Sequence, residues 1–268
     1  MADDPHPNPP SPSDTDVASG VASQWIIAGI ISASARFIPI PFLDEIVQNR
    51  CRRYAVKTAL DSRTVNLQLS SLKPYYSTPS GCFTGCLGMM LKLPIKLLLF
   101  PFRKIILVVT SVRGVPLEIM RVYLLGRTLD RYLSDGRLGQ SENSLRIDDK
   151  AYAARMGSAF DQSFSRMDMH VVFAAMKDAT GGFTELGSAA IVGLKSVFDR
   201  SNKSARAFVA EPEVKAEVFR IQESFSQAEM VALFENFDRR FDDALQGDSL
   251  EQASPARNSR GTETQPHR

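Results

Sequence analysis

Apolar side chains recur every three to four residues along most of this chain, which is the period of an amphipathic helix. In the C-terminal half four such stripes follow one another: Tyr152, Met156, Phe160, Phe164 and Met167; Phe183, Leu186, Ala190, Leu194 and Val197; Val214, Val218, Ile221 and Phe225; and Met230, Phe234, Phe237, Phe241 and Leu245. We predict an all-α fold of about eight helices, in which this half is an amphipathic bundle. One short strand is expected near Val65, Leu67 and Leu69.

The N-terminal half is more apolar and is punctuated by proline. A first helix is predicted over 17–37, and Pro39 and Pro41 end it. The next helix has Asp44 and Glu45 in its first turn, where acids favour the helix dipole. We expect Arg52, Arg53 and Lys57 to face away from its apolar side. A further helix should begin at Pro116 and end near Leu133, before Ser134-Asp135-Gly136.

Composition along the chain divides it into five segments. The Pro-rich residues 1–18 and the polar tail 247–268 are predicted to be disordered, because they lack the apolar residues that a core needs. Between them we expect an apolar, basic, membrane-associating helical region over 19–135, a polar linker over 136–147 and an acidic helical region over 148–246.

The most apolar stretch, residues 89–109, contains only four charges: Lys92, Lys96, Arg103 and Lys104. Thirteen Leu, Ile, Phe and Val residues favour insertion by roughly 4–8 kcal/mol. Three charges near the middle oppose it by about 7–10 kcal/mol. An isolated transmembrane helix is therefore not favoured. Three hypotheses remain: an interfacial or re-entrant helix with its basic stripe among anionic head groups, a kinked span, and a buried core helix of a soluble bundle.

A second apolar segment, over 21–38, contains Trp25 and strengthens the membrane hypothesis. We count Trp25 with Lys92, Lys96, Arg103 and Lys104 as a candidate lipid contact.

The net charge of +2 conceals a strong asymmetry. Residues 21–140 hold 16 bases and 6 acids, a balance of +10, whereas residues 141–249 hold 13 bases and 18 acids, a balance of −5. Such a distribution indicates an anionic partner for the basic half. The alternative is that the two halves dock on each other. Basic residues within apolar sequence, without interleaved exposed aromatics, favour a membrane surface over nucleic acid.

Candidate chemistry is sparse. Three cysteines cannot form a disulfide framework, so a reducing compartment is expected. Cys82 and Cys86 lie four apart within a glycine-rich segment and are a candidate acylation site or thiol pair, or simply small residues at a packing point. His170, next to Asp168, is the only histidine outside the tails, and a core or surface histidine is the simpler interpretation. Asp238, Asp242 and Asp243 are expected to be solvated charges.

We expect no metal, no cofactor, no nucleic acid and no enzymatic activity, because no catalytic motif occurs. No small-molecule substrate is identified either. The glycine spacing of residues 182–187 matches a phosphate-binding loop, but the required lysine is missing.

Residues 38–44, Ile-Pro-Ile-Pro-Phe-Leu-Asp, followed by a basic helix, resemble a short signature of bacterial helical membrane-associated domains of unknown function, some of which are appended to GTPases. This resemblance implies an α-helical membrane-proximal module and no catalytic residues.

The first hypothesis is therefore a non-enzymatic, membrane-associated helical protein at the cytoplasmic face, whose basic half contacts anionic lipid. Its acidic half would carry any protein-partner surface. The alternative is a soluble helical bundle that buries residues 89–109 and binds a partner protein or an apolar ligand in a Met- and Phe-lined cavity.

Overall fold

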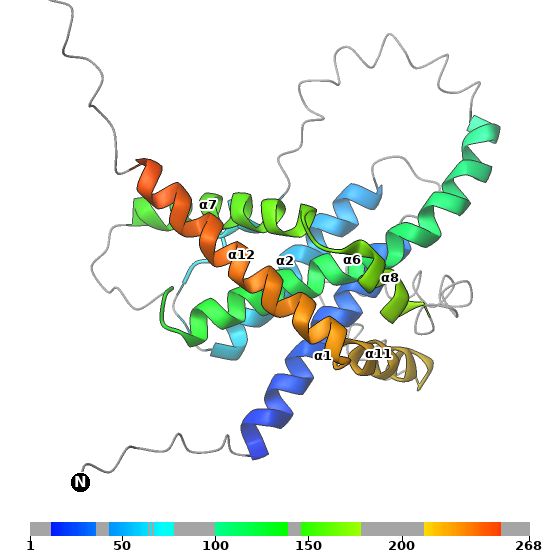
Figure 1. Ribbon diagram of the computed structural model, residues 1–268, viewed down its shortest axis with the longest axis horizontal. Helices are drawn as coiled ribbons and strands as arrows, with labels where there is room; N and C mark the ends of the chain where they lie inside the picture. Colours follow the sequence, from blue (N-terminus) through cyan, green and yellow to red (C-terminus); the bar gives the residue numbers. More distant parts are fainter. Residues whose placement is uncertain are drawn as a thin grey trace, which may run out of the picture.

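The computed structural model describes residues 12–35, 43–63, 65, 67–77, 100–138, 146–177 and 212–252. These residues form eight helices and no strand, which confirms the predicted all-α class and shows that the strand expected near Val65 is wrong. The helices are α1 (Pro12–Ser34), α2 (Leu43–Arg63), α3 (Lys73–Tyr76), α6 (Phe100–Ser134), α7 (Arg146–Ser165), α8 (Met169–Met176), α11 (Pro212–Phe225) and α12 (Ala228–Gln252) (Figure 1).

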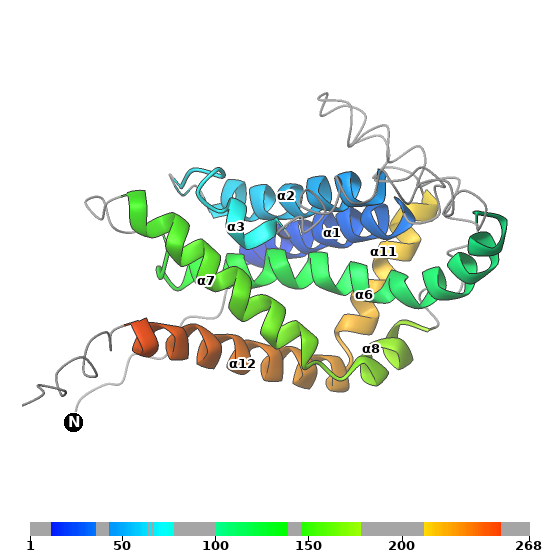
Figure 2. The ribbon, with the colours of Figure 1, turned by 90° about the horizontal axis from the view of Figure 1, so that it is seen from above.

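Helix α6 runs through the middle of the assembly, with α1 and α2 on one side and α12 on the other (Figure 2). The crossing of α1 and α6 is close, because a Cβ added at Gly29 would lie 2.8 Å from the Cα of Ile119. Glycine is therefore required at this crossing. Helices α1, α2 and α6 belong to the basic half of the chain and α12 to the acidic half. The described parts of the two halves therefore share one layered helical assembly.

Pro116 lies inside α6 rather than at a helix start, so the predicted boundary is wrong. A proline removes one main-chain hydrogen bond and crowds the preceding turn. Val115, Ile119 and Met120 are buried around it, and their packing offsets this local cost. The curvature of α6 is visible in Figure 2. The predicted end is confirmed, because α6 stops at Ser134 and Gly136 adopts a φ of 66°.

The predicted stripes of α7, α11 and α12 form much of the core, and the stripe predicted over 183–197 lies outside the described residues. Met156 and Phe160 of α7 are buried, as are all predicted members from α11 and α12. The rings of Phe160 and Phe237 meet edge to face at 5.5 Å, which joins α7 to α12. Tyr123 of α6 contacts Phe225 and Phe234 at 4.6 and 5.7 Å, which joins α6 to α11 and α12.

Two helices extend into segments predicted to be disordered. Helix α1 begins at Pro12, a residue that fits the first turn because its missing N–H has no intrahelical partner there. Helix α12 continues past Gly247 to Gln252. Extending a helix that already exists gains a hydrogen bond for each residue added, so a polar sequence can continue it.

Candidate functional site

A buried ion pair between Arg52 and Glu118 links α2 to α6. Arg52 Nη2 donates to Glu118 Oε1 and Oε2 at 3.1 and 3.3 Å, and Ser32 Oγ of α1 donates to Oε1 at 2.7 Å. The side chains of Arg52 and Glu118 are only 8% and 3% exposed. The expectation that Arg52 faces away from the apolar side is therefore wrong.

Glu118 is a functional candidate that the sequence interpretation missed. It is the only acid between Asp61 and Asp130, and it stands in a strongly apolar context. A buried charge normally requires a partner, so an isolated acid there is a signal that a base must approach it. The sequence did not indicate which base, because Arg52 lies 66 residues away.

A pocket of about 860 Å³ opens where α2, α3, α6 and α7 meet. Four bases line it: Arg52, Lys73, Arg121 and Lys150. One acid, Asp161, faces them. The remaining polar lining is mostly hydroxyl groups, supplied by Ser70, Ser71, Tyr76, Ser77 and Ser158. We call this the basic pocket. Its lining differs from the Met- and Phe-lined cavity that the alternative hypothesis expects.

Arg121 is held in the pocket wall by three contacts. Its Nη2 forms an ion pair with Asp161 of α7. Its guanidinium lies over the rings of Phe160 and Phe164, at 5.9 and 5.4 Å from their centres. Burial lowers the pKa of Arg121, and the positive charge of Arg52 lowers it further. Two guanidinium groups of like charge therefore lie near each other at this pocket.

Helix α3 is fixed against α6 and α7, which gives the pocket a firm wall. Tyr75 Oη donates to the carbonyl of Leu125 at 2.9 Å, and its ring meets that of Phe160 at 6.1 Å. A Cβ added at Gly157 would lie 2.7 Å from the carbonyl oxygen of Pro74. Only glycine allows α7 to approach α3 this closely.

The outward side of α2 adjoins the pocket. Six exposed residues lie within an arc of about 100° on a helix of 3.6 residues per turn: Ile46, Arg50, Arg53, Tyr54, Lys57 and Asp61. We call this set the α2 face. Burial raises the pKa of Tyr76, and the charge of Arg53 opposes that rise. Tyr76 lines the pocket, so Arg53 of the α2 face lies near the edge of the basic pocket.

Most of the residues predicted to bind lipid, and the predicted acylation site or thiol pair, lie outside the described part of the chain. Cys82, Cys86, Lys92 and Lys96 lie outside the described residues, as do the side chains of Arg103 and Lys104 on α6.

Trp25 is 4% exposed and lies in the core. Its Nε1 donates to the carbonyl of Ala55 at 3.1 Å, and a Cβ at Gly126 would lie 2.5 Å from the indole. In this fold Trp25 therefore serves packing between α1, α2 and α6, and no surface contact.

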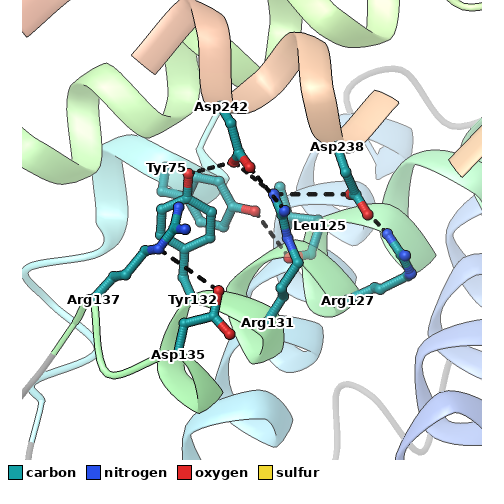
Figure 3. A network of polar contacts seen from close by, with 9 residues as sticks. All are labelled: Tyr75, Leu125, Arg127, Arg131, Tyr132, Asp135, Arg137, Asp238 and Asp242. Carbon is teal, nitrogen blue, oxygen red and sulfur yellow. Dashed lines mark hydrogen bonds and ion pairs between the residues drawn. The ribbon is translucent and has the colours of Figure 1, made fainter. Parts of the chain in front are cut away.

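Asp238 and Asp242 are not solvated charges, and that expectation is wrong. Arg127 Nη1 donates to Asp238 at 2.8 Å (Figure 3). Arg131 donates to both oxygens of Asp242 at 2.7 and 3.0 Å, and Tyr132 Oη donates to the same carboxylate at 2.6 Å. These contacts dock acidic α12 on basic α6, so part of the charge asymmetry is satisfied within the chain.

Asp168 and His170 do not form an acid–base pair. Asp168 caps α8, where its carboxylate accepts the backbone N–H of His170 at 2.9 Å, and the His170 side chain is exposed. Within the described ranges, no group of three or more His, Cys, Asp and Glu side chains is placed to hold a metal ion. None of the helices, as far as their residues are described, is long and apolar enough to cross a bilayer.

The fold and pocket define an all-α protein with a basic, hydroxyl-rich pocket. Comparison of the chain with protein-family models, curated proteins and solved structures found no significant match. The resemblance of residues 38–44 to helical membrane-associated domains stays a prediction, and residues 38–42 lie outside the described ranges.

Proposed function

We propose that this chain is a non-enzymatic, membrane-associated helical protein that binds an anionic lipid surface through the α2 face. The observation that carries the proposal is the combination on one exposed arc of three bases, Arg50, Arg53 and Lys57, with two exposed large apolar side chains. Ile46 and Tyr54 are 48% and 40% exposed. Basic and apolar groups on one helix face are typical of helices that lie at a bilayer surface.

The charge of the α2 face gives the expected strength of binding. Each base near an anionic bilayer contributes about 1 kcal/mol, so three contribute about 3 kcal/mol. Asp61, which is exposed and pairs with Lys57 at 3.4 Å, offsets about one of these charges, so about 2 kcal/mol remains. Attachment through this face alone would be weak and reversible. Lys92, Lys96, Arg103 and Lys104 are proposed to add to it.

The cytoplasmic leaflet is the proposed site, because anionic lipids are concentrated there. Helices α11 and α12 would then face water, and their exposed acids are the proposed surface for a protein partner.

Co-sedimentation of the full chain with vesicles tests the proposal. We expect binding to phosphatidylserine-containing vesicles, little binding to phosphatidylcholine vesicles, and a marked loss for an Arg53→Gln/Lys57→Gln variant. The matched control is Lys215→Gln/Arg239→Gln, which removes two exposed bases from α11 and α12. An equal loss for both pairs, or no binding by the unaltered chain, would refute the α2 face as the lipid contact.

A further inference from the structure

We infer that the basic pocket binds a phosphate monoester, carried either by a soluble small molecule or by a lipid head group. The inference goes beyond the proposed membrane contact, since it concerns a separate set of residues and a defined ligand chemistry. It rests on the pocket's charge, donor groups, size and rigidity.

The charge balance of the pocket matches a dianion. Its lining supplies four positive charges, from Arg52, Lys73, Arg121 and Lys150. Asp161 supplies one negative charge, and Glu118, bonded to Arg52, supplies another. The net charge is therefore +2. A phosphate monoester carries about −1.5 to −2 at neutral pH, whereas a diester or a carboxylate carries −1.

The groups in the lining suit a phosphate more than a flat or apolar ligand. Arginine presents a planar fork of N–H donors and lysine a point charge, and both are common phosphate ligands. Ser71, Ser158 and Tyr76 add hydroxyl groups to the lining, whereas the hydroxyl groups of Ser70 and Ser77 already donate to Gln68 Oε1 and to the Lys73 carbonyl. The volume of about 860 Å³ exceeds what phosphate alone needs, so the ester's organic part has room beside it.

The two arginines are positioned before any ligand arrives. Glu118, which itself accepts a hydrogen bond from Ser32, holds the Arg52 side chain. Asp161 and two phenylalanine rings hold Arg121. Such restraint lowers the conformational cost of binding. Lys73 and Lys150, by contrast, are exposed at the pocket and can close on the ligand.

Two probes distinguish the sources of the phosphate group. Glycerol 3-phosphate is a soluble monoester, and phosphatidic acid presents the same group on a lipid. We expect calorimetric titration of the full chain to detect glycerol 3-phosphate, with glycerophosphoglycerol, a diester, on the order of tenfold weaker. Binding to phosphatidic acid vesicles beyond that to phosphatidylserine vesicles of equal surface charge would identify a lipid source.

Variants separate this site from the α2 face. Lys73→Gln/Lys150→Gln changes two exposed side chains, so the fold should persist, and circular dichroism checks this. We expect the double variant to lose monoester binding on the order of tenfold while keeping its binding to phosphatidylserine vesicles. Arg50→Gln/Lys57→Gln, which leaves Arg53 beside the pocket unchanged, should do the reverse. If neither probe prefers a monoester to a diester or to phosphatidylserine, or if Lys73→Gln/Lys150→Gln binds like the unaltered chain, the inference is wrong.

Discussion

Arg52 of α2 and Glu118 of α6 form an ion pair in the protein interior, although 66 residues separate them in sequence. Ser32 of α1 bonds the same carboxylate, so three helices meet at one buried charge pair. The pair fixes the orientation of Arg52 at the edge of the basic pocket. Its integrity should therefore affect both stability and binding.

Removing the charge of only one partner of this ion pair should destabilise the fold. Glu118→Gln leaves the buried Arg52 charge without its countercharge, and we expect the free energy of unfolding to fall by about 3–5 kcal/mol. The double change Arg52→Met/Glu118→Leu removes both charges and should recover most of that loss. Urea denaturation of the three proteins measures this. A loss below about 1 kcal/mol for Glu118→Gln would contradict the buried pair.

The contacts between Arg131 and Asp242 should be energetically coupled. The guanidinium and the carboxylate meet in a two-bond arrangement and are partly shielded from solvent. A double-mutant cycle with Arg131→Gln and Asp242→Asn should give a coupling of about 1–2 kcal/mol. Asp243→Asn is the control, because Asp243 is exposed on the same helix. Additive effects of the two substitutions would mean that this contact does not dock α12 on α6.

Gly157 should resist replacement by alanine. The added Cβ would lie 2.7 Å from the carbonyl oxygen of Pro74, which is a backbone atom and cannot move aside cheaply. We expect Gly157→Ala to destabilise the fold by about 1–3 kcal/mol and to weaken ligand binding in the basic pocket. Gly20→Ala in α1 meets no atom within 4 Å and should be neutral or stabilising. Thermal unfolding curves that rank the two variants in the opposite order would refute the close α3–α7 approach.

Glu217 should make stability depend on pH. Burial raises the pKa of Glu217, and the nearby Arg220 only partly opposes this rise. The folded state therefore binds a proton more readily than the unfolded state, whose glutamate has a pKa of about 4.3. This contribution to stability is fully present below that value and is lost as the pH rises through the raised pKa.

Glu217→Gln removes this titration. We expect the free energy of unfolding of the variant to equal or exceed that of the unaltered protein at neutral pH. In acid, the difference between the two proteins should shift in favour of the unaltered protein. The difference in unfolding free energy between the two proteins, measured at acidic and at neutral pH, checks the prediction. A difference that does not change with pH would mean that Glu217 titrates normally in the folded protein.

The sequence was sufficient to predict the helices whose burial follows a regular period. Met230, Phe237 and Leu245 of α12 are buried where the spacing placed them, because a single apolar side fixes how that helix must face. Pro116 was interpreted wrongly, since local preference treats proline as a helix start. Tertiary packing holds it inside α6 instead.

Charged residues show where sequence patterns fall short. Arg52 and Asp242 are hydrophilic and were expected to face water, yet each meets a partner from a distant helix. The periodicity of one helix carries no information about such a partner. The same limit applies to the basic pocket, because Lys73, Arg121 and Lys150 come from separate segments and only the fold brings them together.

The central claim, that the α2 face meets an anionic bilayer, is tested most directly by the environment of Tyr54. A polarity-sensitive dye is attached at Tyr54→Cys in a Cys82→Ser/Cys86→Ser background; Cys51 can stay, because its thiol is buried and burial raises its pKa. Phe219→Cys on α11 is the control, at a side chain that is 65% exposed. With phosphatidylserine vesicles we predict a blue shift for the dye at position 54 and none at position 219. No shift at position 54, or an equal shift at both positions, would contradict the account.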